Sequence, residues 1–506
     1  MSDSKEGMDT LEVEHVNDIL DYKKSESLDL EWTEDDESRI RMKMASPSIH
    51  ITFDWRLVPT LWLLYLLCFI DRSSIGNARI QGLEKDLNTA INFRFNWALT
   101  VFYISYIAIE IPSTILLRII GARYYLPLLV IAFGFISMCS AFVTNYGGLV
   151  ACRFFLGIAE GGMMPGIAFY LSCFYRRQEL MFRIGIFISG ASLAGAFGGL
   201  LAAGLSSIPQ WGIASMPLYG WRNIFFFEGI ITFLLAGLAI LVLPSRPDQC
   251  KFLNKRGRYI ALERINREHH EDIQAKTTFK DVRVGICNIN NTIYGLGFLF
   301  ATISAQSLSL FLPTILKALG WTALKTQFYS VPPYAVACVW TFTVSWLSDR
   351  YNRRGIFAAL NAAISMTGYC IVVTAKTDTI RYLGVFFAAS GSFPNGPGFL
   401  SWGLNNAAGP AIRAVTSGYI VAVGNLGALV ATWTYLPTDG PKYSRGHYVN
   451  VAAEVMVLLL ALLGIAYARW ENKKRDSGAR DHRLSGLTDE EIQGLGYKHP
   501  SFRYIS

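Results

Sequence analysis

Apolar stretches of about 20 residues recur along the chain, separated by short polar segments. A helix of that length crosses the hydrocarbon core of a bilayer. The pattern predicts twelve membrane-spanning helices, at residues 57–80, 97–119, 125–144, 148–173, 182–206, 222–243, 284–312, 327–348, 355–374, 381–403, 413–436 and 448–469. The hydrophilic segment 244–283 divides them into two sets of six.

This pattern also predicts how the chain is organised. We expect an N-terminal tail at 1–56, a six-helix half at 57–243, a central loop at 244–283, a second half at 284–469 and a C-terminal tail at 470–506. Many transporters are built from two such repeats, with the substrate site between them. Glycine and alanine recur every three to four positions in residues 185–204. Small residues let helices approach closely, either for static packing or for rocking.

Composition and charge agree with a membrane protein. Only 17% of the residues are charged, compared with about 25% in soluble proteins. Cytosolic loops are enriched in lysine and arginine, which here gather in the central loop and in three short loops. The short loops carry Arg118, Arg123, Arg176, Arg177, Arg183, Arg350, Arg353 and Arg354. Both termini are therefore predicted to be cytosolic, and the net charge of +8 needs no nucleic-acid partner.

Two of the predicted spans carry charges near the middle of the bilayer. Asp71 and Arg72 lie about nine residues from the outer end of the first span, and Glu160 lies about eleven from that of the fourth. Arg153 is two helical turns from Glu160, on the same face and nearer the outside. Ionisable residues inside a membrane are costly and often mark a substrate or proton path. The alternative is a set of salt bridges that only joins the two helices.

These four residues suggest a coupling between an anion and a proton. An arginine offers a permanently charged fork that suits a carboxylate. An anion that binds Arg72 or Arg153 would compete with Asp71 or Glu160. The displaced carboxylate would then be protonated more easily.

Other polar residues inside the spans are candidates for ligand contacts or for bonds between helices: Tyr106, Gln306, Asn395 and Asn425. Glu110 and Glu228 are expected to have structural roles, near the cytosolic side or near Arg222. The segment "FPNGPG" at 393–398 is predicted to interrupt its helix, because proline and glycine both disfavour a continuous helix.

The sequence gives no indication of an enzyme, a metal site or a cofactor. Seven histidines are present, but none lies inside a predicted span. The eight cysteines form no CxxC pair and are expected to pack as small apolar residues. The start of the chain has no signal-peptide pattern, so the first inserted span is expected at Leu57.

The loop "SWLSDRYNRRG" at 345–355 resembles the cytoplasmic loop signature of the major facilitator superfamily. Ser345 and Asn352 occupy positions where glycines are usual. The resemblance implies the major facilitator fold and a cytoplasmic gate. The residues that match the signature are Asp349, Arg350, Arg353 and Arg354.

Further stretches resemble the anion:cation symporter family of that superfamily, and its fungal allantoate/vitamin permease branch in particular. They include "FIDRSSIGNA", "RFFLGIAEGGMMPG", "GWRNIFFFEG" and "SRGHYVN", and the resemblance covers about residues 50–470. It implies that Asp71 and Glu160 carry protons while Arg72 and Arg153 bind the anion. The ending "HPSFRYIS" resembles the ends of fungal nicotinate permeases.

Together these features predict a secondary transporter that imports a small organic anion with protons by alternating access. The expected substrate is a vitamin-type monocarboxylate such as nicotinate or pantothenate. The alternatives are allantoate, another ureido acid or an amino-acid-derived acid, and a nutrient sensor with a transporter fold. We expect a monomer in the plasma membrane, with the endoplasmic reticulum or the vacuolar membrane as the alternative.

Overall fold

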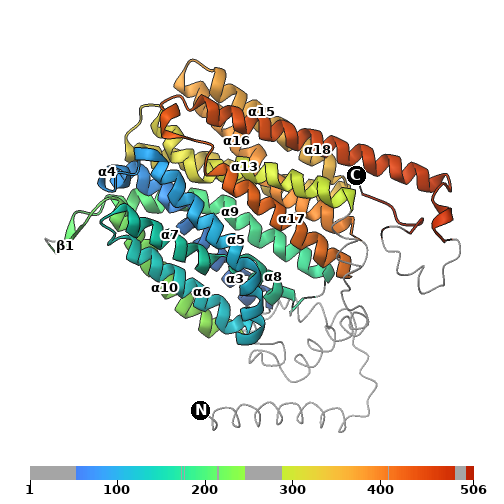
Figure 1. The fold of residues 1–506 in the computed structure, drawn as a ribbon, viewed down its shortest axis with the longest axis horizontal. Coiled ribbons are helices and arrows are strands. Elements are labelled where there is room, and N and C mark those ends of the chain that lie inside the picture. The colour runs from blue at the N-terminus through green and yellow to red at the C-terminus, as the bar shows by residue number, and fades with distance from the viewer. Residues whose placement is uncertain are drawn as a thin grey trace, which may run out of the picture.

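A computed structural model describes residues 53–172, 174–175, 177–213, 216–244, 288–407, 410–484, 497 and 499–505. The predicted N-terminal tail and central loop fall almost entirely outside these residues. Within the described residues the chain is nearly all helical (Figure 1). This agrees with an all-α membrane protein.

The first half contains the helices predicted from the apolar stretches. They are α3 (Phe53–Ala78), α5 (Arg94–Ile120), α6 (Ala122–Ser140), α7 (Tyr146–Glu160) with α8 (Met163–Ser172), α9 (Arg177–Ser206) and α10 (Trp221–Val242). The loop after α3 contains η1 (Arg79–Leu83), α4 (Glu84–Asp86) and η2 (Ile91–Phe93). Strands β1 (Trp211–Ile213) and β2 (Met216–Leu218) form an antiparallel hairpin before α10.

The second half repeats the arrangement. Its helices are α13 (Ile289–Lys317), α14 (Ala323–Tyr351), α15 (Arg354–Thr374), α16 (Asp378–Asn405), α17 (Pro410–Ala431) and α18 (Ser444–Asp476), with short turns η4 (Pro437–Asp439) and η5 (Asp481–Leu484). The two halves lie side by side (Figure 1). Seven of the described helices are long and apolar enough to cross a membrane.

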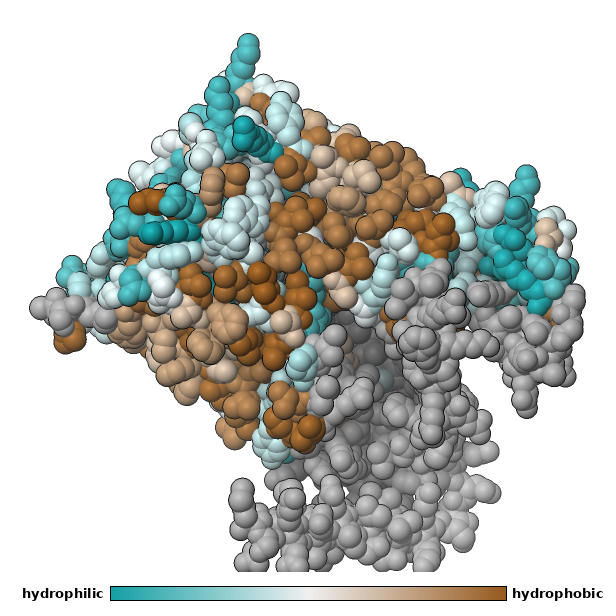
Figure 2. Space-filling view, in the orientation of Figure 1, coloured by the Kyte–Doolittle hydropathy of each residue, from teal (hydrophilic) through white to brown (hydrophobic). Residues whose placement is uncertain are grey.

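The surface of the bundle is that of a protein whose helices cross a bilayer. Figure 2 shows a broad hydrophobic area between hydrophilic ends. Large apolar side chains face outward on this surface, among them Leu241, which is 79% exposed, and Val339, which is 67% exposed. In a soluble protein so large an apolar surface would be unusual, whereas lipid covers it in a membrane.

We call the end of the bundle that carries β1 and β2 the hairpin end, and side-chain hydrogen bonds between the halves gather toward it. Gln81 Nε2 donates to Gln327 Oε1 at 2.9 Å. Lys317 Nζ donates to a backbone carbonyl of η1 at 3.0 Å. The hydroxyls of Thr100 and Thr432 lie 2.9 Å apart. The two halves are therefore held together at this end.

Small residues of α9 also contribute to the contact between the halves. A Cβ atom placed on Gly195 would lie 2.6 Å from the ring of Tyr334, and one on Gly199 would lie 2.6 Å from the hydroxyl of Ser330. Both partners belong to α14 in the second half. The small residues predicted to permit close approach thus lie where the two halves meet.

One prediction about the backbone was wrong. Helix α16 runs without interruption through "FPNGPG", with Pro394 and Pro397 inside it. Each proline removes a single backbone hydrogen bond, and neighbouring groups in a membrane bundle can satisfy the freed carbonyl. The interruption occurs instead in the fourth span, where α7 ends at Glu160 and α8 begins at Met163.

The described end of the C-terminal tail folds back onto the bundle at the end opposite the hairpin. The carbonyl of Ile505 accepts from Trp402 Nε1 at 2.8 Å, and its backbone N–H donates to Asn406 Oδ1 at 2.8 Å. Tyr504 forms a matching pair of backbone bonds with the Asn472 side chain. Burial here raises the pKa of the Tyr504 phenol to about 12. The tail is thus anchored to both α16 and α18.

Candidate functional site

A buried ion pair joins α3 and α7 inside the first half. Arg72 donates from Nε and Nη2 to Glu160 Oε2, at 3.1 and 2.9 Å. The side chains are 7% and 0% exposed, so the pair is shielded from solvent. Cys68, one turn before Arg72, donates its thiol hydrogen to the same oxygen at 3.3 Å. This cysteine therefore does more than pack as an apolar residue.

Aromatic rings surround the guanidinium of Arg72. Its carbon lies 4.8 Å from the centroid of the Phe69 ring, 5.4 Å from that of Phe102 and 4.9 Å from that of Tyr106. A cation over aromatic faces is stabilised by their quadrupoles, more strongly where water is excluded. The rings come from α3 and α5, and they fix the position of the arginine fork. Tyr106 thus lies at the predicted anion site.

The close crossing of α5 and α7 depends on glycine. A Cβ atom on Gly157 would lie only 2.3 Å from the carbonyl oxygen of Phe102, and one on Gly161 would lie 2.6 Å from that of Tyr106. The four-residue spacing places both glycines on one face, as in many packed membrane helices. Glu160 is the last residue of α7, and the negative end of a helix dipole favours a nearby cation such as Arg72.

Asp71 and Arg153 lie in the same cluster but do not form an ion pair in the described residues. The hydroxyl of Ser137 on α6 donates to Asp71 Oδ1, while Asp71 Oδ2 has no hydrogen-bond partner. Arg153 is 2% exposed, and its guanidinium lies 5.4 Å from the centroid of the Phe225 ring. Its Nε atom is also without a partner. Of the two predicted arginines, Arg72 is neutralised by direct contact and Arg153 is not.

Glu228 belongs to this cluster, contrary to the prediction that placed it near the cytosolic side or near Arg222. It is 3% exposed and accepts a hydrogen bond from Ser74 on α3. Arg222 instead donates to the carbonyl of Ala141 at 2.6 Å. Six residues on a helix rotate a side chain by about 600°, so Arg222 and Glu228 point roughly 120° apart. The pattern of single charges in α10 could not reveal the serine on another helix.

The cluster therefore contains three acids and two bases. The four residues predicted from the sequence sum to zero charge, but Glu228 adds one acid. Each of the three carboxyl groups has one oxygen without a hydrogen-bond partner. Burying an unpaired charge costs several kcal/mol. The site is electrically neutral only when one carboxyl group holds a proton.

The remaining candidate ligand residues are divided between different places. Gln306 Oε1 accepts a hydrogen bond from the Tyr103 hydroxyl at 3.0 Å. This bond joins the two halves, and Tyr103 lies one helical turn before Tyr106 on α5. Asn425 donates to Glu110 Oε2 at 3.0 Å, a bond between helices α17 and α5. Asn395 is fully buried within the second half, and neither of its amide atoms has a partner. Tyr106 alone among these four residues contacts the Arg72 pair directly.

The predicted gate residues lie where α14 turns into α15. Asn352 has a φ of 52°, a left-handed conformation that asparagine adopts more readily than most residues. This explains how it replaces a glycine. Arg354 donates to Ser401 at 2.6 Å, and the guanidinium of Arg350 lies 5.4 Å from the Trp346 ring centroid. Arg353 is exposed, and the side chain of Asp349 lies outside the described part of the chain.

Within the described residues, no group of three or more histidine, cysteine, aspartate or glutamate side chains is arranged to hold a metal ion. The five cysteines described as free are Cys68, Cys139, Cys152, Cys338 and Cys370.

Comparison with known proteins identifies the family. The sequence profile of the Major Facilitator Superfamily matches residues 61–432. The chain is 32% identical over 432 residues to the MFS-type transporter efuF of Hormonema carpetanum, covering 85% of this chain and 86% of the relative. The chain thus belongs to the major facilitator superfamily and is a multi-pass membrane transporter.

Solved structures support the same fold. A bacterial homologue of the human lysosomal transporter Spinster, inward-facing and unoccupied, aligns with a TM-score of 0.64 at 18% identity over 84% of this chain and 98% of that one. A D-xylose-proton symporter aligns with a TM-score of 0.61 at 15% identity, over 82% and 97%. The predicted major facilitator fold is confirmed.

Proposed function

We propose that this member of the major facilitator superfamily imports a small organic anion together with one or more protons. The observation that carries the proposal is the buried cluster of three carboxyl groups and two arginines in the first half. A site with one acid in excess must hold a proton or lose stability. A site with two buried arginines attracts an anion. Both cargoes therefore have residues that match their chemistry.

The two cargoes compete for the same groups. An entering carboxylate that binds Arg72 displaces Glu160, whose Oε1 atom already lacks a partner. The displaced carboxyl group is then stable in the membrane only when it binds a proton. Anion and proton thus enter together. Arg153, on the same helix as Glu160, is the second group that attracts the anion. Asp71 is the second proton-binding group that we propose.

The surroundings of Arg72 favour a flat acid. Three aromatic side chains, Phe69, Phe102 and Tyr106, lie within 5.4 Å of its guanidinium. Aromatic rings stack favourably on planar partners. This supports a monocarboxylate with a ring, such as nicotinate, over the more polar allantoate and other ureido or amino-acid-derived acids. It also agrees with the fungal vitamin branch of the anion:cation symporter family, and pantothenate remains a second candidate.

The arrangement of the halves supports alternating access. Their described hydrogen bonds gather toward the hairpin end, which the loop charges assign to the outside. One solved structure with this fold, the bacterial Spinster homologue, is inward-facing, and another is a D-xylose-proton symporter. We propose a monomer of the plasma membrane that rocks about the central site, with Gln306 and Asn425 between the halves and Asp349, Arg350, Arg353 and Arg354 as the cytoplasmic gate.

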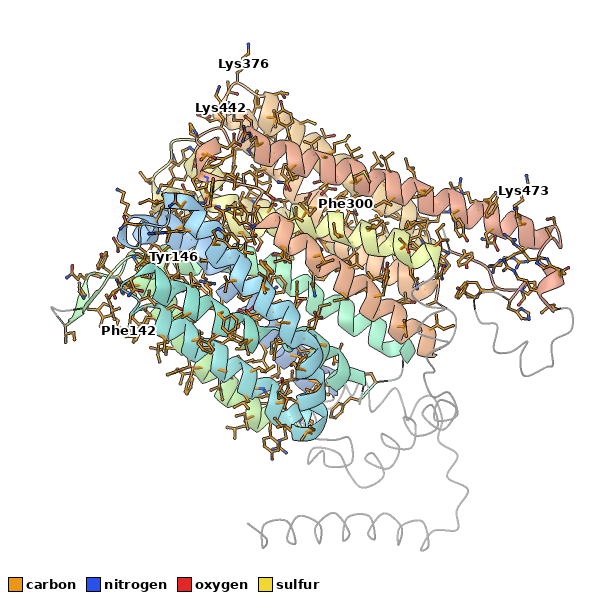
Figure 3. The ribbon with its side chains drawn as sticks, viewed as in Figure 1. Phe142, Tyr146, Phe300, Lys376, Lys442 and Lys473 are labelled. Carbon is orange, nitrogen blue, oxygen red and sulfur yellow. The ribbon has the colours of Figure 1, made fainter. Side chains whose placement is uncertain are left out.

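The test is uptake of labelled nicotinate by cells that lack their own permease, at pH 5 and pH 7.5, with and without an uncoupler. Faster uptake at pH 5 that the uncoupler abolishes is the expected result. Arg72→Ala should abolish it at normal surface expression. Lys376→Ala is the matched control, because Lys376 is an exposed cation in the loop before α16, at the edge of the second half (Figure 3). Normal uptake by Arg72→Ala would refute the anion site.

A second variant separates the proton from the anion. Glu160→Gln retains a side chain that can contact Arg72 but cannot ionise. Exchange of labelled for unlabelled nicotinate should continue, whereas accumulation driven by a pH gradient should fall. Accumulation equal to that of the unaltered protein would assign proton coupling to another group. If nicotinate is not transported, competition among pantothenate, allantoate and related acids identifies the substrate class.

A further inference from the structure

A second buried carboxyl group lies inside the second half, where the mechanism above does not use it. Glu454 is on α18 and is completely buried. Its Oε1 atom accepts from the hydroxyls of Ser365 on α15, at 3.0 Å, and Ser392 on α16, at 3.2 Å. Its Oε2 atom has no partner. In the described residues it forms no ion pair.

Neutral polar groups surround Glu454. Besides Ser365 and Ser392, the side chains close to it are Ser304 on α13 and Asn395 on α16. Both are completely buried, and neither Ser304 Oγ nor the amide atoms of Asn395 have a hydrogen-bond partner. Among the described residues, the titratable group near Glu454 is Tyr369 on α15, whose hydroxyl donates to the carbonyl of Ser304 at 3.3 Å.

The same arrangement occurs in the first half. Glu228 lies eight residues after Gly220, and Glu454 lies eight residues after Gly446, each on the sixth helix of its half. The first helix of each half brings a serine to the carboxyl group: Ser74 to Glu228 and Ser304 to Glu454. The halves differ at the fourth helix. There the first half has a cation, Arg153, and the second has Ser392 and Asn395.

The absence of a cation among the described neighbours of Glu454 favours a bound proton over a charged carboxylate. Ser392 also donates to the carbonyl of Ala388 at 2.8 Å, so its one hydrogen is shared between two acceptors. An ionised group at this position would be fully buried with few donors, which is costly in a membrane. A carboxylic acid supplies its own hydrogen and can donate it to a hydroxyl or to Asn395 Oδ1.

Direct hydrogen bonds join the oxygens around Glu454. The hydroxyls of Ser365 and Ser392 lie 2.8 Å apart, and both lie within 3.2 Å of Glu454 Oε1. The carboxyl group and the two hydroxyls are thus closed into one hydrogen-bonded group, which a protonated carboxyl group can join as a further donor.

The surrounding groups can also stabilise the ionised form, if they reorient. A hydroxyl can donate or accept, and an amide that rotates by half a turn presents its NH₂ in place of its oxygen. Ser304, Ser365, Ser392 and Asn395 together could supply four donors. A permanently protonated acid would need a single acceptor. The surplus of groups that can reverse their hydrogen bonds indicates that both states are used.

We propose that Glu454 is a further proton-binding site, separate from the cluster in the first half, and that it is loaded and unloaded in each transport cycle. The proposal rests on the proton-coupled transport proposed above. The carboxyl O–H bond breaks, the proton passes to water on the side to which the transporter is open, and Asn395 turns its NH₂ toward the carboxylate. Ser304 lies two residues from Gln306, whose bond to Tyr103 joins the halves. The proton can thus influence the contact between them.

The first measurement needs no substrate. Infrared difference spectra of the purified protein in liposomes between pH 5 and pH 8 should contain a carboxylic acid signal that Glu454→Gln removes. Met456→Leu, on the lipid-facing side of the same helix, should leave it unchanged. If Glu454→Gln fails to fold, Ser365→Ala should shift the pH midpoint of that signal. A signal unaffected by either variant would overturn the proposal.

The second measurement is transport in proteoliposomes with the membrane potential clamped at zero. Each coupled proton multiplies the limiting accumulation of nicotinate by about ten per pH unit, since one pH unit corresponds to 1.36 kcal/mol. Glu454→Gln should retain exchange and lower that limit about tenfold. Accumulation equal to that of the unaltered protein would overturn the proposal. Failure of the unaltered protein to accumulate nicotinate would count against the proposed function, and the infrared result would still decide the role of Glu454.

Discussion

The ion pair between Arg72 and Glu160 can be tested by removing its charges one at a time and then together. Arg72→Met leaves Glu160 as a buried acid without its partner, and Glu160→Leu leaves Arg72 without its carboxylate. Both side chains are more than 90% buried. Breaking a buried pair in this way costs about 3–5 kcal/mol, because the remaining charge is uncompensated.

The double variant should behave differently from either single variant. Replacing a whole buried pair with apolar groups of similar volume is often neutral, or stabilising by about 1–4 kcal/mol. Methionine and leucine would fill the space among Phe69, Phe102 and Tyr106 with no charge left to bury. We therefore expect the free energy of unfolding to fall in both single variants and to recover in the double variant, while uptake is lost in all three.

The assay combines unfolding of the purified protein with uptake at matched surface expression. A factor of about one hundred or more in the unfolding equilibrium is expected between single and double variants, which corresponds to at least 3 kcal/mol. A double variant as unstable as the single ones would show that the pair is not what the single substitutions disturb. A stable double variant that still transports would show that the pair only joins helices.

Further predictions concern the scaffold around the site. Gly157→Ala should prevent stable expression, because its Cβ atom would lie 2.3 Å from a backbone carbonyl of α5. Gly237→Ala is the control and should be tolerated, because a Cβ atom there has nothing within 4 Å. Fluorescence-detected size exclusion measures the yield of both variants, and a normal yield of Gly157→Ala would contradict the close packing of α5 and α7. Arg475→Gln should release the C-terminal tail, because Arg475 donates to the carbonyl of Phe502 at 2.6 Å. A protease should then digest the tail faster than in the unaltered protein, whereas Lys473→Gln should leave the rate unchanged. An unchanged rate in Arg475→Gln would contradict the docking of the tail on α18.

The sequence predicted the helices and part of the site because both follow from one-dimensional rules. Apolar length defines a span, and counting residues from its end gives a depth. Arg72 and Glu160 were placed at similar depth by this count, and they lie 2.9 Å apart. Such a count gives the depth of a residue in the membrane, but it does not give the direction in which the side chain points around the helix. It placed Asp71 near the middle of the bilayer and Arg153 nearer the outside, but for that reason could not determine whether they form an ion pair.

The parts that the sequence did not predict depend on side chains from other helices. Glu228 was expected near the cytosolic side or near Arg222, whereas its partner Ser74 is more than 150 residues away along the chain. Glu454 lies inside the predicted span 448–469, but its serine neighbours on other helices carry no charge and could not be identified from the sequence. The uninterrupted α16 likewise depends on its neighbours, since isolated proline and glycine residues favour a break.

The difference between the two halves bears on how anion and proton can be coupled. Both halves place a glutamate on their sixth helix beside a serine of their first, but buried arginines join it in the first half alone among the described residues. The first half can therefore exchange a carboxylate of its own for that of a substrate without changing its net charge. The second half can change its charge only by gaining or losing a proton. If each half carries one proton per cycle, a monoanion crosses with two protons, and one net positive charge moves inward. An inside-negative membrane potential then drives uptake as well as the pH gradient does, which suits an importer that works against a steep gradient of a scarce acid.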